Sequence, residues 1–185
     1  MQYDFDKYTE RRGSGAMMTD CVKEKFGRDD LLPLWIADMY FETPAPVREA
    51  VEKRLSHQIY GYSTAPDSYW RSILDWEKDV HGWDVRREQL SFIPGIVRGI
   101  AFVIRCFTDP GDKVVVQTPV YDPFFNFAKR LGRTVVENPL IERDGHYEMD
   151  FDGLDRIFDK RVKLLVLCNP HNPIGIIWPK ETLEK

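Results

Sequence analysis

The hydrophobic pattern divides the chain into an irregular front and a regular remainder. Residues 1–45 follow no fixed period and predict an arm. Apolar residues recur at helical spacing beyond Pro46, which suits the first turn of a helix, and they do so again over 69–80. We therefore assign residues 1–45 to an N-terminal arm or small-domain segment and residues 46–185 to the first part of a large domain.

From residue 89 onward, short apolar runs alternate with amphipathic segments. The runs predict strands at 89–94, 113–118, 133–137 and 163–168. The segments between them predict helices at 96–107, 122–131 and 150–159. This alternation is typical of a mainly parallel sheet that helices cover on both faces, so the predicted fold class is α/β, a three-layer sandwich.

A last predicted helix begins at Pro179, and the sequence stops at Lys185 before the apolar face of that helix has appeared. A natural terminus rarely falls within the first two turns of a charged helix. We therefore expect this chain to be the front half of a larger protein, with an incomplete large domain.

Composition argues against several classes of protein. The chain has 185 residues, of which 43% are apolar, and its formal net charge of −4 includes no basic block, which disfavours nucleic acid as a partner. The first residues are too polar for a signal peptide, and no apolar run is long enough to cross a membrane. Three widely separated cysteines predict neither a disulfide framework nor a zinc site. We expect a cytoplasmic protein without a membrane partner.

The loops after three predicted strands carry residues that suit a small ligand. Gly95 allows a sharp turn, and the backbone N–H groups of Ile96 and Val97 would then open a helix, where an anion such as phosphate binds well. Tyr121 follows the next strand and could lie flat on a heteroaromatic ring. Asn172, in an Asn-Pro-His-Asn-Pro turn, could hydrogen-bond a ligand oxygen.

Each of these features also has a purely structural explanation. Gly95 could form an ordinary strand–helix turn, Tyr121 could cap the core, and Asn172 could serve the turn alone. Their combination favours a ligand site. If all three loops lie at the carboxyl edge of one parallel sheet, a single cofactor could contact them together.

Several motifs resemble those of the class I/II aminotransferase-like enzymes that use pyridoxal phosphate, and most closely the MalY/PatB-type cystathionine β-lyases, a branch of carbon–sulfur lyases. The most branch-specific stretch is Leu-Pro-Leu-Trp-Ile-Ala-Asp-Met at 32–39. The other matching stretches are Arg-Arg-Gly at 11–13, Tyr-Gly-Tyr-Ser at 60–63, Pro-Gly-Ile-Val at 94–97, Thr-Pro-Val-Tyr at 118–121 and Cys-Asn-Pro-His-Asn-Pro at 168–173. The resemblance covers the chain from end to end and implies the fold type I architecture of these enzymes.

The resemblance also implies residue roles around pyridoxal 5'-phosphate. Gly95, Ile96 and Val97 would hold the phosphate, Tyr121 would stack on the pyridine ring, and Asn172 would bond the phenolic oxygen. Tyr62 would reach the phosphate of a neighbouring subunit in a homodimer. Ala37 would lie near the carboxylate of an amino-acid substrate. The role of Tyr62 implies that the active site lies between two subunits.

The family's catalytic lysine has no counterpart in residues 1–185, so no catalytic residue is assigned and we expect this chain alone to be inactive. For the full-length protein, the resemblance implies β-elimination of cystathionine or a cysteine S-conjugate to pyruvate, ammonia and a thiol. Two alternatives stay open. The complete protein could be an aminotransferase of the same family, or the chain could be a non-catalytic, truncated module.

Overall fold

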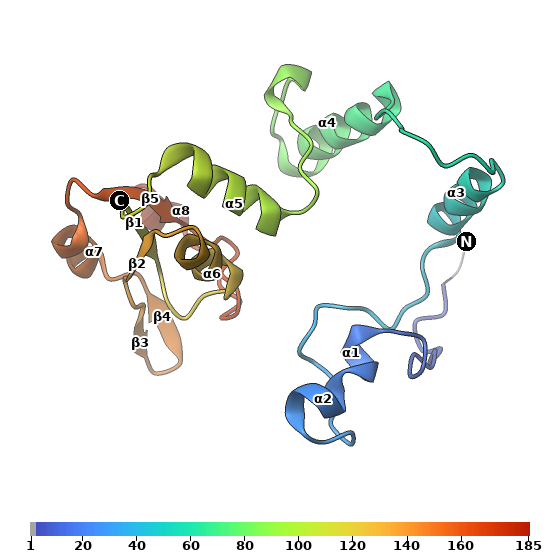
Figure 1. The fold of residues 1–185 in the computed structure, drawn as a ribbon, viewed down its shortest axis with the longest axis horizontal. Helices are drawn as coiled ribbons and strands as arrows, with labels where there is room; N and C mark the ends of the chain where they lie inside the picture. Colours follow the sequence, from blue (N-terminus) through green and yellow to red (C-terminus); the bar gives the residue numbers. More distant parts are fainter. Residues whose placement is uncertain (1–2) are drawn as a thin grey trace. The chain divides into compact units, whose positions relative to one another are not determined.

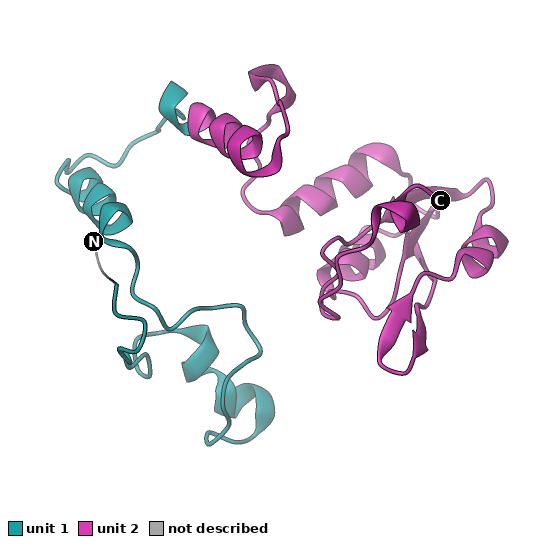
Figure 2. Cartoon of the chain, turned by 180° about the vertical axis from the view of Figure 1, so that it is seen from behind, with its two compact units in different colours: residues 1–69 teal, residues 70–185 magenta. Residues whose placement is uncertain are grey.

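The structure is a computed structural model that describes residues 3–185 (Figure 1). The chain divides into two compact units, one that ends at Tyr69 and one from Trp70 to Lys185 (Figure 2). The assignment of residues 1–45 and 46–185 to different domains concerns the complete fold and stays a prediction. Within the described residues, no helix is both long enough and apolar enough to cross a bilayer.

The first unit is built from short helices and extended connections. Its helices are α1 (Met17–Asp20), α2 (Val22–Phe26), α3 (Ala45–Leu55) and the start of α4 (Asp67–His81). The prediction of an irregular arm is therefore wrong over α1 and α2, which together bury Met18 and Val22. Each of these helices has one turn or little more, which is too short to display a helical period in the sequence.

The predicted helices beyond Pro46 and over 69–80 are confirmed as α3 and α4. Pro46 lies in the first turn of α3, where its missing N–H group costs no hydrogen bond. The apolar side chains of Val47, Val51 and Leu55 follow one another at helical spacing along α3, yet each is more than half exposed. Within the first unit, α3 therefore buries no residue.

The second unit is an α/β structure with one parallel sheet and one hairpin. Its helices are the end of α4, the 3-10 helix η1 (Arg87–Gln89), α5 (Ile96–Phe107), α6 (Pro123–Arg130), α7 (Phe151–Ile157) and α8 (Lys180–Leu183). Its strands are β1 (Lys113–Val116), β2 (Thr134–Glu137), β3 (Ile141–Arg143), β4 (His146–Glu148) and β5 (Val162–Val166). The predicted helices at 96–107, 122–131 and 150–159 are confirmed, as are the strands at 113–118, 133–137 and 163–168.

The parallel sheet has the strand order β2-β1-β5. The central strand β1 pairs in parallel with both neighbours, and its Val114 is opposite Val135 of β2 and Leu164 of β5. Val114, Val115 and Val116 are fully buried. A run of buried β-branched residues is what a central parallel strand requires, because both of its faces are covered.

Helices α5 and α6 pack against each other and against the sheet, and α7 lies across the sheet from α6 (Figure 1). One core cluster joins Ile104 of α5, Val114 of β1 and Ala128 of α6. A second cluster, around Val116, Val120 and Cys168, extends this core to the carboxyl ends of β1 and β5. The predicted mainly parallel sheet with helices on both faces is confirmed.

The predicted strand at 89–94 is wrong. Gln89 is the last residue of the 3-10 helix η1, and residues 90–94 belong to neither sheet of the described chain. A strand requires a neighbour for its backbone groups, and apolar content alone cannot supply one. The turn at Gly95 therefore follows an irregular segment and not the end of a strand of this sheet.

The antiparallel hairpin of β3 and β4 was not predicted. Arg143 pairs with His146 across a two-residue loop. Asp144 and Gly145, which form this loop, both have positive φ, at 52° and 79°. An Asp-Gly pair in this conformation matches the right-handed twist of the flanking strands, and it is the sequence signal that identifies the hairpin.

Candidate functional site

The loops after β1 and β5 lie together at the carboxyl edge of the parallel sheet. The backbone N–H group of Tyr121, in the loop after β1, donates to the carbonyl oxygen of Asn172, in the loop after β5, over 3.0 Å. The two strands are neighbours in the sheet and run in parallel, so their carboxyl ends meet at the same edge. An aromatic side chain and an amide side chain are thereby brought to one place.

The turn at 169–175 is held by hydrogen bonds at both of its ends. The N–H group of His171 donates to the carbonyl oxygen of Ile176 over 2.7 Å, and the N–H group of Gly175 donates back to the carbonyl oxygen of His171 over 2.7 Å. The indole N–H of Trp178 donates to the carbonyl oxygen of Cys168 over 3.1 Å. Gly175 has a φ of 73°, a conformation that glycine adopts without a steric penalty.

Asn172 has a fixed backbone and a free side chain. Its N–H group donates to Sγ of Cys168 over 3.3 Å, and its carbonyl oxygen accepts from Tyr121. The residue is exposed, and its side-chain amide has no hydrogen-bond partner among residues 3–185. The amide can therefore donate to or accept from a ligand.

Tyr121 presents part of its ring to solvent. The side chain is 42% exposed, and the ring packs edge-to-face against Phe124 at a centroid distance of 5.6 Å and an interplanar angle of 87°. A ring that is supported along its edge can still stack through its face on a planar ligand.

Gly95 and the start of α5 form the third predicted element. Gly95 has a φ of 96°, and α5 begins directly after it at Ile96. The first turn of a helix leaves its N–H groups without acceptors inside the helix, so those of Ile96 and Val97 can bind an anion, assisted by the helix dipole of this 12-residue helix. Helix α5 packs on β5 and α6, but no hydrogen bond in the described residues joins this turn to Tyr121 or Asn172.

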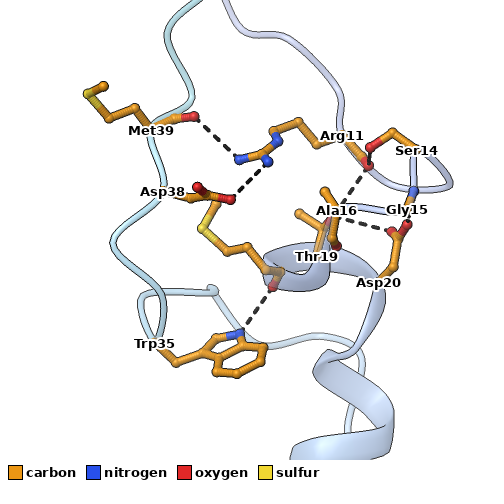
Figure 3. A network of polar contacts seen from close by, with 10 residues as sticks. Arg11, Ser14, Gly15, Ala16, Thr19, Asp20, Trp35, Asp38 and Met39 are labelled. Atoms are coloured by element: carbon orange, nitrogen blue, oxygen red, sulfur yellow. Dashed lines mark hydrogen bonds and ion pairs between the residues drawn. The ribbon is translucent and has the colours of Figure 1, made fainter. Parts of the chain in front are cut away.

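Ala37 lies in the first unit, in a loop that a polar network holds (Figure 3). Arg11 donates from Nη2 to Oδ2 of Asp38 over 2.9 Å and from Nη1 to the carbonyl oxygen of Met39 over 3.3 Å. The indole N–H of Trp35 donates to the carbonyl oxygen of Met18 over 3.1 Å. Residues on both sides of Ala37 are thus anchored to Arg11 and Met18, and Ala37 itself is exposed.

The carboxyl group of Asp20 stabilises the same arm (Figure 3). It accepts from the N–H groups of Gly13 over 2.9 Å and Gly15 over 2.8 Å. The bond from Gly13 is the main reason why the pKa of Asp20 lies below its usual range, and the bond from Gly15 acts in the same direction. The ionised side chain of Asp20 therefore stabilises the Arg11–Gly15 turn.

Tyr62 also belongs to the first unit, in the extended connection between α3 and α4. Its side chain is fully exposed within the described chain. Ala37 and Tyr62 are thus both accessible in the described chain. Tyr121 and Asn172, by contrast, are joined by a hydrogen bond.

The lysines that open strands lie away from this edge. Lys113 is the first residue of β1 and forms an ion pair with Asp159, and Lys163 is at the start of β5. Both occupy the amino ends of their strands, whereas Tyr121 and Asn172 follow the carboxyl ends. Neither lysine is therefore placed to serve a ligand there.

No site role was predicted for His171, which is buried in the turn that carries Asn172. Its Nε2 atom lies 2.9 Å from the carbonyl oxygen of Pro119, in the loop that carries Tyr121. The only indication in the sequence that His171 belongs to the site is its position next to Asn172. Its partner, however, is 52 residues away in the chain.

Residues 29–185 match the family described as aminotransferase class I and II. Cystathionine β-lyase PatB of Bacillus subtilis is 43% identical over 183 residues, which are 98% of this chain and 47% of PatB. Protein MalY of Escherichia coli is 32% identical over 184 residues, which are 98% of this chain and 47% of MalY. The chain thus spans about half the length of the curated relatives that it matches.

Solved structures give the same result. Cystalysin from Treponema denticola, whose crystal structure contains pyridoxal 5'-phosphate, has a TM-score of 0.92 and 35% identity, and the match covers 100% of this chain and 48% of cystalysin. The pyridoxal-phosphate-bound C–S lyase from Staphylococcus hominis has a TM-score of 0.88 and 34% identity, with 99% and 47% of the two chains covered. The family match, the relatives and the fold agree: this chain belongs to the aminotransferase class I and II family.

Proposed function

We propose that the full-length protein is a pyridoxal-phosphate-dependent C–S β-lyase that converts cystathionine or a cysteine S-conjugate to pyruvate, ammonia and a thiol. The observation that carries the cofactor site is the bond between the Tyr121 N–H group and the Asn172 carbonyl oxygen, which holds the two loops together at the edge of the parallel sheet. The proposal is also supported by the relatives named cystathionine β-lyase and C–S lyase.

The donor set of this chain fits pyridoxal phosphate. The cofactor has a phosphate, a planar ring and a phenolic oxygen, and the described residues include matching groups for each of them. The N–H groups of Ile96 and Val97 would hold the phosphate, with Gly95 shaping the turn. The half-exposed ring of Tyr121 would stack on the pyridine, and the free side-chain amide of Asn172 would donate to the phenolic oxygen.

When bound, pyridoxal phosphate withdraws electrons from the α carbon of an amino-acid substrate and so makes its α-proton easier to remove. The residues described above bind and orient the cofactor. Proton transfer needs a lysine, which the family resemblance places in the part of the relatives beyond the matched half. We therefore propose that residues 1–185 supply binding contacts and that they are inactive by themselves.

The family resemblance gives two further residues proposed roles. Ala37 would lie near the substrate carboxylate, in the loop fastened by Arg11 and Asp38. The exposed Tyr62 would reach the phosphate of a neighbouring subunit, which requires a homodimer. A Tyr62→Ala variant that remains dimeric should therefore bind the cofactor more weakly. We further propose that the enzyme works in the cytoplasm.

The proposal is tested by incubating the full-length enzyme with cystathionine, the cofactor and a 2-oxo acid other than pyruvate, which can accept an amino group. A β-lyase produces pyruvate and a free thiol in equal amounts. An aminotransferase, the second candidate, is favoured by the relative named LL-diaminopimelate aminotransferase, at 33% identity. It would convert a 2-oxo acid to an amino acid without releasing a thiol. Amino transfer without pyruvate or thiol would reject the lyase proposal.

A further inference from the structure

Two loops that carry proposed cofactor contacts are joined through the side chain of His171. Its imidazole is 1% exposed, although Asn172 beside it is exposed. Its Nε2 atom lies 2.9 Å from the carbonyl oxygen of Pro119. A carbonyl oxygen can only accept, so the hydrogen bond requires the proton on Nε2 and fixes the ring tautomer.

The other ring nitrogen of His171 shows that packing alone does not explain why a histidine occupies this buried position. Nδ1 is buried, and it has no hydrogen-bond partner among residues 3–185. A buried polar atom without a partner is unfavourable, and an apolar side chain of similar size would avoid that cost. What an apolar side chain could not supply is the hydrogen bond from Nε2 to Pro119.

This bond is one half of a two-point connection between the loops. The second half is the bond from the Tyr121 N–H group to the Asn172 carbonyl oxygen. The imidazole is itself held in place, because it packs edge-to-face on Trp178 at 5.5 Å and 86°. Two connections at neighbouring residues restrict rotation of one loop against the other, which a single hydrogen bond cannot do.

We infer that His171 is a positioning residue that fixes the orientation of the Tyr121 ring relative to the Asn172 amide. The inference rests on the proposed function, in which these two groups contact the same cofactor. Pre-organised contacts bind more tightly than mobile ones, because no ordering cost arises on binding. His171 would thus act on cofactor affinity and on the environment of the cofactor ring, without touching the ring.

The test compares His171→Gln with His171→Leu in the full-length protein. The side-chain amide nitrogen of glutamine can reach the position of Nε2 and keep the bond to Pro119, whereas leucine removes it. The matched control is His146→Leu, which makes the same change at an exposed position of β4. The measurements are the dissociation constant of pyridoxal phosphate, the visible absorption of the bound cofactor, and hydrogen exchange of the Tyr121 amide without cofactor.

We expect His171→Leu to weaken cofactor binding about tenfold, the effect of losing one hydrogen bond, and to speed exchange of the Tyr121 amide. It should also shift the absorption band, because the contacts to the ring change. His171→Gln should stay within about threefold of the wild type, a smaller change than the tenfold loss expected when the bond is removed. His146→Leu should match the wild type in all three measurements.

Equal affinity, spectrum and exchange in the wild type and His171→Leu would overturn the inference, as would equal losses in the leucine and glutamine variants. If His171→Leu fails to fold, His171→Asn replaces it, since its shorter side chain cannot reach Pro119. Retention of binding by Gln and its loss in Asn would then support the inference, and equal behaviour would reject it. Failure of the wild type to bind the cofactor would reject the proposed function and, with it, this inference.

Discussion

Asn172 combines a backbone bound on both sides with a side chain that is free. Its N–H group and its carbonyl oxygen are both occupied, by Cys168 and by Tyr121. The sequence could predict that an amide would stand at this strand end, because the Asn-Pro turn follows an apolar run. It could not predict the role of His171, because that role depends on Pro119, which only the folded sheet brings near.

At the residue scale, replacing Asn172 by alanine should weaken cofactor binding and leave the turn intact. The side chain makes no hydrogen bond among the described residues, so its loss should not destabilise the loop. One hydrogen bond to a charged oxygen contributes about 1.5–3 kcal/mol, so the dissociation constant should rise by at least about tenfold.

This change is measured by titrating the full-length protein with pyridoxal phosphate and by thermal unfolding without it. Asn126→Ala, at an exposed position of α6, is the matched control and should bind the cofactor normally. A large fall in thermal stability with unchanged affinity for pyridoxal phosphate would contradict the proposed role of Asn172. It would mean that the side chain stabilises the turn instead.

At the element scale, regular periods identified the long helices and the strands of the parallel sheet. Helix α5 was predicted with the bounds that the structure shows, because its apolar residues recur along 12 positions. The segment at 89–94 was mistaken for a strand, since apolar content does not reveal whether a pairing partner exists. The helices α1 and α2 were missed because each is too short to show a period.

The turn into α5 should be sensitive to its backbone conformation. Gly95 has φ 96° and ψ 144°, a region that other residues avoid, and no atom lies within 4 Å of the place of an added Cβ. Gly95→Ala should therefore destabilise the fold by about 1–3 kcal/mol through backbone strain, without a clash. It should also weaken phosphate binding, because the N–H groups of Ile96 and Val97 would turn away.

Gly99, in the same helix, offers a control for which the expected change in stability has the opposite sign. A Cβ there would meet only the Ile93 side chain at 3.6 Å, an ordinary contact, and the backbone is helical. Gly99→Ala should stabilise the protein by about 0.5–1 kcal/mol, because alanine loses less conformational freedom than glycine. Urea unfolding measures both variants, and equal effects would contradict the assignment of strain to Gly95.

Helix α5 also allows a test of where the core lies. Ile104 is fully buried against Val114 and Ala128, whereas Ile96 is 78% exposed. Ile104→Ala should reduce the free energy of unfolding by about 2–5 kcal/mol, because it removes buried methyl groups and leaves a cavity. Ile96→Ala should change it by less than about 0.5 kcal/mol. Similar losses at both positions in urea unfolding would mean that α5 presents a different face to the sheet.

At the scale of the whole molecule, the second unit contains a three-stranded sheet with β2 and β5 at its edges. Much of the apolar surface of α5 is exposed in the described chain, including Phe102 at 55% and Phe107 at 70%. The relatives PatB and MalY are about twice as long as this chain.

The alternation of strands and helices in the sequence predicted the parallel sheet, whereas no comparable pattern predicted the division into two units at Tyr69.

The central claim is that these residues bind pyridoxal phosphate while a lysine outside residues 1–185 carries the chemistry. The most direct measurement adds pyridoxal phosphate to the full-length protein, records the visible spectrum before and after borohydride, and maps the labelled residue. We expect a band that disappears on reduction and a label on a lysine beyond Lys185. The absence of a band, or a label on a lysine within residues 1–185, would contradict the account.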